Sequence, residues 1–227
     1  MTLEFLSPDP AGPNPPRSPL LDVALAAGAV TEVRDGWEGV AFFGDAAAEA
    51  AACADSVGFA DLSGMAKLEL QVPAQSAPAD EFNARTAQRI AGGWRCPLRP
   101  TRELVLCEPA RAELARADLA AAGRLCDLTS SLAALAIAGP LARETIARFC
   151  ALDLREATVP VCGFRPGSVA RTPGFVLREG SDRFLVMFGA ACAEYLWETV
   201  ADAAAALGGR PVGVAALPEI VAEPSHA

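Results

Sequence analysis

Histidine is nearly absent from this chain of 227 residues, and the only one, His226, is the penultimate residue. A Ser-His-Asp or Cys-His arrangement would need its base from a loosely held terminus, which argues against nucleophilic catalysis of that kind. Glycine-rich phosphate loops are also missing, and "AGGWR" and "LGGRP" are predicted to be turns. The sequence has no apolar run of ~18 residues and no signal-peptide pattern, so we expect a cytoplasmic protein without membrane contact.

Positive charge is scarce as well, because Lys67 is the only lysine and 28 acidic residues face 19 basic ones. A net charge of −9 repels phosphate backbones, which argues against a nucleic-acid partner. The seven cysteines are an odd number without a Cys-x-x-Cys pair, so we predict buried, reduced thiols rather than disulfides or zinc ligands. Neighbouring acidic residues such as Asp80 and Glu81 are interpreted as a solvated helix face and not as an acid–base pair.

The first part of the chain divides into an arm and a series of short elements. Residues 1–17 are rich in proline and are predicted to form an extended arm. Ser18 is expected to cap a short helix that ends at Gly28. "VTEV" and "GVAFF" flank the turn "RDGWEG" and predict a hairpin, after which Asp45 caps an alanine-rich helix. Apolar and polar residues alternate in "KLELQV", which predicts a half-buried strand with Lys67 on its polar face.

Two later segments of the sequence resemble each other. "FADLSGMAKLELQVPAQSAPADEFN" and "LCDLTSSLAALAIAGPLARETIARFC" share an Asp-Leu-Ser/Thr entry, a strand, a break and a helix, and Asp61 and Asp127 are 66 residues apart. The stretch "REATVPVCGFRPGSVARTPGFVLRE" leaves room for two further strands in the second copy. The sequence therefore predicts a duplicated α+β fold, with halves at residues 18–123 and 124–217 and a C-terminal tail at 218–227.

The hydrophobic pattern of the second half predicts a sheet covered by a helix. One stripe of the last predicted helix is expected to be buried, and it comprises Cys192, Leu196, Val200, Ala203 and Leu207. The strand "AALAIA" is apolar on both faces, so we expect part of it to be exposed and to contact a partner chain. Hydrophobic residues make up 52% of the sequence without counting glycine, whereas an average soluble domain has about 45 to 50% with glycine included. This excess also indicates a protein that is covered by a partner.

Two phrases resemble a known family. The run "SPLLDVALAAGAVTEVRDGWEGVAFFGDAAAEAAACADSVGFADLSGMAKLEL" is similar to the opening of the glycine cleavage T protein (aminomethyltransferase) superfamily. The phrase "DLTSSLAALAIAGPLARETIARFCALDL" looks more like the gamma subunit of heterotetrameric sarcosine oxidase, a shortened member of that superfamily. Together the matches cover most of residues 18–217. The resemblance implies a T-protein-like folate-binding-domain fold with helix-covered antiparallel or mixed sheets, whose two pseudo-repeated halves exchange strands.

The resemblance also implies a position for a folate site, and the sequence departs from it at three points. The family's aspartate beside tetrahydrofolate is missing where Ile90 leads through "AGG" to Trp94. A family glutamate falls on Leu185, and a family arginine falls on Leu217. Only Met65 remains from the pocket wall, so it is the single cofactor contact that the resemblance carries over. We expect no catalytic residue and no metal site in this chain.

The function that the resemblance favours is a noncatalytic, gamma-like structural subunit of a heterotetrameric sarcosine oxidase-type complex, which performs folate-linked oxidative N-demethylation. The partners implied are flavoprotein subunits of the alpha, beta and delta kind. Tetrahydrofolate, FAD, FMN, NAD and zinc would be held by those subunits and not by this chain. Two alternatives stay open, namely a folate-dependent aminomethyl- or methyltransferase of the T-protein type and a folate-binding module without catalysis.

Overall fold

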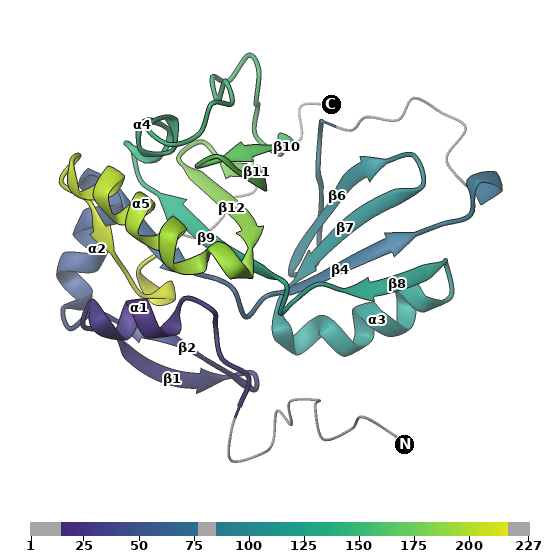
Figure 1. The fold of residues 1–227 in the computed structure, drawn as a ribbon, viewed down its shortest axis with the longest axis horizontal. Coiled ribbons are helices and arrows are strands. Elements are labelled where there is room, and N and C mark those ends of the chain that lie inside the picture. Colours follow the sequence, from purple (N-terminus) through teal and green to yellow (C-terminus); the bar gives the residue numbers. More distant parts are fainter. Residues whose placement is uncertain (1–14, 77–84, 218–227) are drawn as a thin grey trace.

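The computed structural model describes residues 15–76 and 85–217, which form helices on both sides of two stacked sheets (Figure 1). The predicted tail, the pair Asp80 and Glu81, His226 and most of the predicted arm lie outside the described residues. The helices are α1 (Leu21–Ala26), α2 (Ala46–Asp55), α3 (Ala112–Ala120), α4 (Ala142–Ala147) and α5 (Ala193–Ala205). No helix among the described residues is long and apolar enough to cross a membrane.

The strands of the described residues are arranged in one hairpin and two larger sheets. In chain order they are β1 (Val30–Arg34), β2 (Trp37–Phe42), β3 (Gly58–Asp61), β4 (Ala66–Gln71), β5 (Gln88–Ile90), β6 (Gly93–Arg99), β7 (Arg102–Cys107), β8 (Arg124–Asp127), β9 (Leu132–Ala138), β10 (Phe164–Val169), β11 (Thr172–Gly180), β12 (Arg183–Gly189) and β13 (Arg210–Pro211). The six-stranded sheet has the order β10-β11-β12-β9-β3-β13, and the five-stranded sheet has the order β5-β6-β7-β4-β8. Among these strands only β13 and β3 pair in parallel, so the fold is mixed α+β with antiparallel and mixed sheets.

The core is built in four layers, and each layer is buried against the next. Helices α1, α4 and α5 contribute to the hydrophobic cluster on one face of the six-stranded sheet. The opposite face of that sheet packs on the five-stranded sheet, where Leu185 and Met187 share a cluster with Trp94 and Leu106. Helix α3 covers the remaining face of the five-stranded sheet. Both sheets are therefore shielded from water on two sides, which stabilises them through burial of apolar area.

The first elements follow local signals that the sequence shows. The Ser18 hydroxyl accepts a hydrogen bond from the Leu20 backbone N–H, and the chain leaves α1 at Gly28 with φ +93°. Strands β1 and β2 pair around a turn at Asp35 and Gly36, and both turn residues have positive φ. The carboxylate of Asp45 accepts hydrogen bonds from two N–H groups in the first turn of α2. The hairpin and the Asp45 cap are confirmed, whereas Ser18 only supports the turn before α1, because the N-cap position of this helix is Leu20 and has no side-chain cap.

The second half contains the two additional strands that the sequence predicts, β10 and β11, and they pair antiparallel. The stripe on α5 is also confirmed. Leu196 and Val200 are fully buried, Ala203 is 8% exposed, and Cys192 and Leu207 pack against the same cluster. The pairs "AGG" and "LGG" lie in turns, because Gly92 and Gly208 both have positive φ.

Three sequence-based expectations are wrong. Strand β9 is fully buried from Ala133 to Ala138, because helices cover one face and the five-stranded sheet covers the other. It therefore exposes no surface to a partner. Strand β4 is buried on both faces and not on one, and Lys67 has no exposed surface. The thiols are free as predicted but not all buried, because Cys126 is exposed and Cys162 and Cys192 are partly exposed.

The chain crosses between the two sheets twice, and the two crossings contact each other. Residues 62–65 lead from β3 in one sheet to β4 in the other, and residues 128–131 lead back from β8 to β9. Asp61 Oδ1 accepts the Ser63 N–H at 2.8 Å, and Asp127 Oδ1 accepts the Thr129 N–H at 2.9 Å. Each crossing thus begins with the same aspartate-stabilised turn. Neither sheet is built from one continuous half of the sequence.

Candidate functional site

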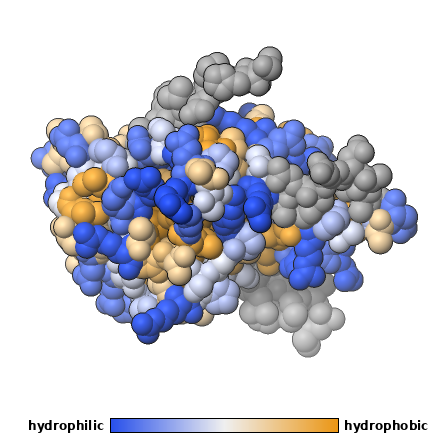
Figure 2. All heavy atoms as spheres, turned by 90° about the horizontal axis from the view of Figure 1, so that it is seen from above, coloured by the Kyte–Doolittle hydropathy of each residue, from blue (hydrophilic) through white to orange (hydrophobic). Residues whose placement is uncertain are grey.

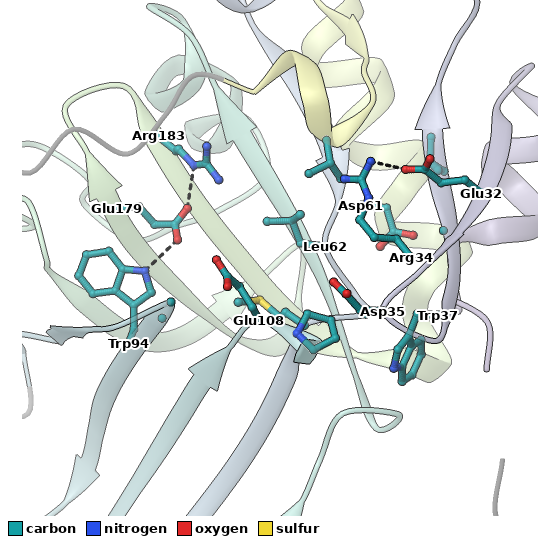
Figure 3. Close-up of a pocket in the computed structure, with 18 of the residues that line it drawn as sticks. Glu32, Arg34, Asp35, Trp37, Asp61, Leu62, Trp94, Glu108, Glu179 and Arg183 are labelled. Atoms are coloured by element: carbon teal, nitrogen blue, oxygen red, sulfur yellow. Dashed lines mark hydrogen bonds and ion pairs between the residues drawn. The ribbon is translucent and has the colours of Figure 1, made fainter. Parts of the chain in front are cut away.

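A cavity of about 510 Å³ lies where the hairpin, the first crossing and the edges of both sheets meet. Its volume is in the range of small-molecule sites. Charged side chains of both signs line it, together with the indole rings of Trp37 and Trp94 (Figure 3). Five acidic residues from different segments of the chain also line the cavity, namely Glu32, Asp35, Asp61, Glu108 and Glu179.

Glu179 is the most firmly held of these carboxylates. Its Oε1 accepts a hydrogen bond from Trp94 Nε1 at 3.0 Å, and its Oε2 accepts one from Arg183 Nε at 3.0 Å (Figure 3). The side chain of Glu179 is 4% exposed, so its charge needs these partners. Because Trp94 belongs to the five-stranded sheet and Glu179 to the six-stranded one, this network joins the sheets across the cavity. Both carboxylate oxygens are engaged, and the group is not poised for proton transfer.

Asp61 lines the cavity and is 8% exposed. Its Oδ1 accepts the Ser63 N–H, while Oδ2 is buried without a hydrogen-bond partner among the described residues. Burial raises the pKa of Asp61, and nearby Ser18, Ser63 and the Lys67 ammonium group offset part of that effect. Asp61 therefore supports the turn at the start of the crossing, and its electrostatic partner is the buried lysine.

The hairpin forms the outer wall of the cavity. Glu32 and Arg34 alternate with Val33 along β1, so both point to the cavity side, where they form an ion pair (Figure 3). The ring of Trp37 packs so close to Gly64 that a β-carbon at that glycine would lie 3.4 Å from it. The hairpin and the first crossing are thus in contact along the wall.

The structure separates the positions that the resemblance had assigned to a folate site. Met65 and Ile90 line the cavity, as expected for a pocket wall. Leu185 is fully buried between the sheets, and Leu217 packs in a small cluster beside Cys53, so neither lines the cavity. These positions offer a folate no paired hydrogen bonds, so the residues present do not fit the family's way of holding it.

Sequence reasoning missed the charged residues that do line the cavity. Glu179 and Arg183 stand on either side of the β11–β12 turn, and Glu32 and Arg34 are i, i+2 neighbours on a strand. The only local signal was the presence of isolated charges at the ends of apolar strands. Within residues 15–76 and 85–217, no group of three or more His, Cys, Asp or Glu side chains is placed to hold a metal ion.

Comparison with known proteins places this architecture in a family. The sequence matches the family of the GCVT N-terminal domain over residues 110–226. A chain of the heterotetrameric sarcosine oxidase from Corynebacterium sp. U-96, in complex with pyrrole 2-carboxylate, is similar with a TM-score of 0.58 and 22% identity. That match covers 71% of this chain and 91% of the other.

The glycine cleavage system aminomethyltransferase T from Bartonella henselae is similar with a TM-score of 0.70 and 17% identity. It covers 89% of this chain, which spans 61% of the aminomethyltransferase. No significant match is found among curated protein sequences. At these identities the structural likeness concerns the fold, which is T-protein-like. Because the family match spans about half of the sequence, the chain belongs to the family of the GCVT N-terminal domain.

Proposed function

We propose that this chain is a noncatalytic, gamma-like structural subunit of a heterotetrameric sarcosine oxidase-type complex that performs folate-linked oxidative N-demethylation. The observation that carries the proposal is the extent of the structural match. It takes in 91% of a chain from such a heterotetramer and 71% of this chain, with a TM-score of 0.58. This likeness supports a subunit of such a complex that is built on the same fold.

The chemistry of the cavity supports a noncatalytic role. Glu179 is neutralised by Arg183 and Glu32 by Arg34, while Glu108 lies 3.8 Å from Arg111. Asp61 is buried beside Lys67. A general acid or base must reach the proton that it transfers, and four of the five cavity carboxylates, all except Asp35, lie beside cations of the chain itself.

The surface supports a protein partner. Six large hydrophobic side chains of the described residues are clearly exposed, and four of them lie on α1 and the hairpin or next to it: Leu25, Val30, Val33 and Phe42. We refer to these four as the hairpin patch. On the face shown in Figure 2, hydrophobic residues likewise lie between hydrophilic ones. Exposed apolar side chains on neighbouring elements, here α1 and the hairpin, are typical of an interface.

The partners that we propose are flavoprotein subunits of the alpha, beta and delta kind, and these would hold the FAD, FMN, NAD, zinc and tetrahydrofolate of the complex. Affinity purification of the tagged chain from its native cells tests this. We expect a flavoprotein to co-purify in a fixed ratio, with visible flavin absorbance. Glycine-cleavage proteins in the eluate, without a flavoprotein, would favour a transferase and contradict the proposal.

A second candidate is a folate-binding module, and the observation that favours it is the cavity itself, with Met65 in its wall. Calorimetric titration of the isolated chain with tetrahydrofolate separates the two. We expect weak binding or none, because leucine at positions 185 and 217 leaves polar ligand atoms unpaired at a cost of ~1 to 3 kcal/mol each. A dissociation constant in the low micromolar range or below would support the module or a transferase.

We also propose that residues 18–123 and 124–217 are the two copies of an ancestral repeat. Reciprocal hydrogen bonds support this. Leu62 N donates to Ala134 O at 2.9 Å, and Leu128 N donates to Lys67 O at 2.8 Å. The Ser63 hydroxyl accepts from Ala134 N, and the Thr129 hydroxyl accepts from Lys67 N. Equivalent residues of the two segments thus make equivalent contacts with the other copy.

A further inference from the structure

The two crossings between the sheets converge on the only lysine of the chain. The Lys67 Nζ donates to the backbone oxygen of Ser63 at 2.8 Å and to that of Met65 at 3.0 Å, both in the first crossing. It also donates to the backbone oxygen of Thr129 at 3.4 Å, in the second crossing. Lys67 is fully buried, so bulk water does not compete for these bonds. One nitrogen atom therefore ties together the two places where the chain changes sheet.

The pseudo-equivalent position in the second copy has no such group. Ala134 makes the same backbone contacts with the first crossing as Lys67 makes with the second, but its side chain is a methyl group. The side-chain tie is thus made once, from the first copy. Nothing in the repeat alone requires a charged residue at this place.

The number of donors on this nitrogen matches the number of acceptors only while the lysine is charged. An ammonium group has three N–H donors and no acceptor, and three carbonyl oxygens surround it. A neutral amine has two donors and a lone pair, so at least one carbonyl loses its partner and faces the lone pair. We propose that Lys67 is a proton-operated tie, which in its charged form holds the two crossings together and so fixes the wall of the cavity.

The surroundings of Lys67 shift its pKa into a range that is accessible to experiments on the folded protein. Burial lowers the pKa of Lys67 to about 8, and Asp61 at the end of β3 and Asp127 at the end of β8 oppose the shift. Asp127 is itself paired with Arg116 of α3. On β4, Glu69 is paired with Arg102 of the neighbouring β7. Asp127 and Glu69 therefore each have an arginine partner.

A change in the contacts of Lys67 would alter the wall of the cavity, because the first crossing forms part of that wall. Leu62, Gly64 and Met65 of the first crossing line the cavity, and the ring of Trp37 rests on Gly64. Trp94 meets Glu179 across the sheets in the same cavity. Two of the three tryptophans of the chain are therefore placed to report a change in the crossing, while Trp197 lies in the hydrophobic core.

Deprotonation of Lys67 weakens the contacts between the crossings, but it does not lower the free energy of unfolding of the whole chain. Because the pKa of Lys67 is lower in the folded protein than its ordinary value of 10.5, the unfolded chain holds this proton more tightly between about pH 8 and 10.5. The contribution of Lys67 to the free energy of unfolding therefore rises with pH across that window. The loosening that we propose is therefore a rearrangement of the crossing in which Lys67 stays out of water, because hydration of the amine would favour its charged form. General alkaline unfolding would instead expose the lysine.

The experiment follows the Trp197→Phe protein from about pH 7 to about pH 9.5, a range that spans the pKa of the buried lysine. Tryptophan emission reports Trp37 and Trp94, and amide hydrogen exchange, corrected for the intrinsic pH dependence, reports residues 62–65. We expect a transition near pH 8 in both signals, with protection of these amides falling roughly tenfold while core strand β9 keeps its protection. A flat response in both signals would overturn the proposal.

Two variants and one labelling measurement serve as controls. Lys67→Arg keeps its charge throughout the range and should abolish the transition, whereas Lys67→Met should show loosened amides already at pH 7. If the larger guanidinium of Lys67→Arg prevents folding, the wild-type chain still decides, because its only primary amines are Lys67 and the N-terminus. With isotopic labelling, the ε-carbon chemical shift of this single lysine reports its protonation, and we expect it to titrate near pH 8 together with the tryptophan emission. Persistence of the transition in Lys67→Arg, or a Lys67 signal that does not change across the transition, would contradict a proton-operated tie. None of these readouts depends on the chain being an oxidase subunit.

Discussion

At the scale of single residues, a few buried polar groups in apolar surroundings fix how segments distant in sequence meet. Glu49 on α2 is 2% exposed, and its two carboxylate oxygens accept the backbone N–H groups of Phe43 and Gly213, each at 2.6 Å. One side chain thus joins the end of the hairpin to the C-terminal segment. Hydrogen bonds to a charged acceptor contribute about 1.5 to 3 kcal/mol each, and loss of one leaves a buried donor unpaired.

Glu49→Gln tests this junction. The amide can accept only one of the two N–H groups and presents its own donors to the other, so we expect the free energy of unfolding to fall by about 2 to 4 kcal/mol. Urea denaturation monitored by circular dichroism measures the change. The matched control is Glu198→Gln on the exposed face of α5, which should shift stability by less than about 0.5 kcal/mol. Equal small effects in both variants would show that the junction is unimportant.

The sequence predicted those residues whose role is local and missed those whose role depends on packing. Asp45 caps the helix that directly follows it, and the Ser18 hydroxyl accepts the N–H of Leu20 two residues later, so neighbours in sequence determine the partners of both. Lys67, Glu49 and Glu179 all have partners from other elements. An alternating pattern cannot tell whether the polar face of a strand meets water or a second sheet, and this ambiguity led to the wrong expectation for Lys67.

At the scale of elements, helix α5 shows how the apolar stripe supports the six-stranded sheet. Leu196 is fully buried in the largest cluster, while Leu114 on α3 is 62% exposed. Leu196→Ala should lower the free energy of unfolding by about 2 to 5 kcal/mol, because it removes buried methyl groups and leaves a cavity. Leu114→Ala should change it by less than about 0.5 kcal/mol. Chemical denaturation of both variants checks the pair, and similar losses would contradict the assigned layers.

The approach of the C-terminal segment to the hairpin depends on a glycine. A β-carbon at Gly213 would lie 1.8 Å from the backbone oxygen of Ala41, whereas at Gly189 it would meet nothing within 4 Å. We expect Gly213→Ala to displace this segment and to lower the thermal unfolding midpoint by several degrees, by about 4 °C or more. Gly189→Ala should leave the midpoint within about 1 °C. Differential scanning calorimetry of the two variants provides the comparison, and an unchanged midpoint for Gly213→Ala would refute the close contact.

Most of the helices and strands could be anticipated from periodicity, caps and turns, but their arrangement into sheets could not. Residues 58–61 belong to the first half in sequence and pair with β9 of the second, while β8 returns to β4. The exchange of strands was expected only because of the resemblance to a family, since long-range pairing leaves no local mark. Without the stacking of the two sheets, β9 looked like a surface that needed a partner.

At the scale of the whole molecule, the hairpin patch replaces the second half as the proposed position of a partner interface. Val33 is the most exposed hydrophobic residue of that patch, at 61%. Val33→Glu adds a charge on a side chain that has little packing to lose, so the fold should remain intact. Binding of a partner at the patch should weaken at least tenfold, because a buried unpaired carboxylate is costly. Leu114→Glu on α3 is the control, and it should bind as the parent chain does.

The central claim is that the chain works as part of a flavoprotein complex, and the most direct test is the molar mass and flavin content of the chain purified with and without its flavoprotein partner. Light scattering during size exclusion should give a self-associated or poorly soluble chain alone, and a single flavin-containing species of defined stoichiometry after co-expression. Val33→Glu should shift the chain out of that species while its circular dichroism stays unchanged. A well-behaved monomer that never enters a flavin-containing species would contradict the account and favour a free-standing binding module.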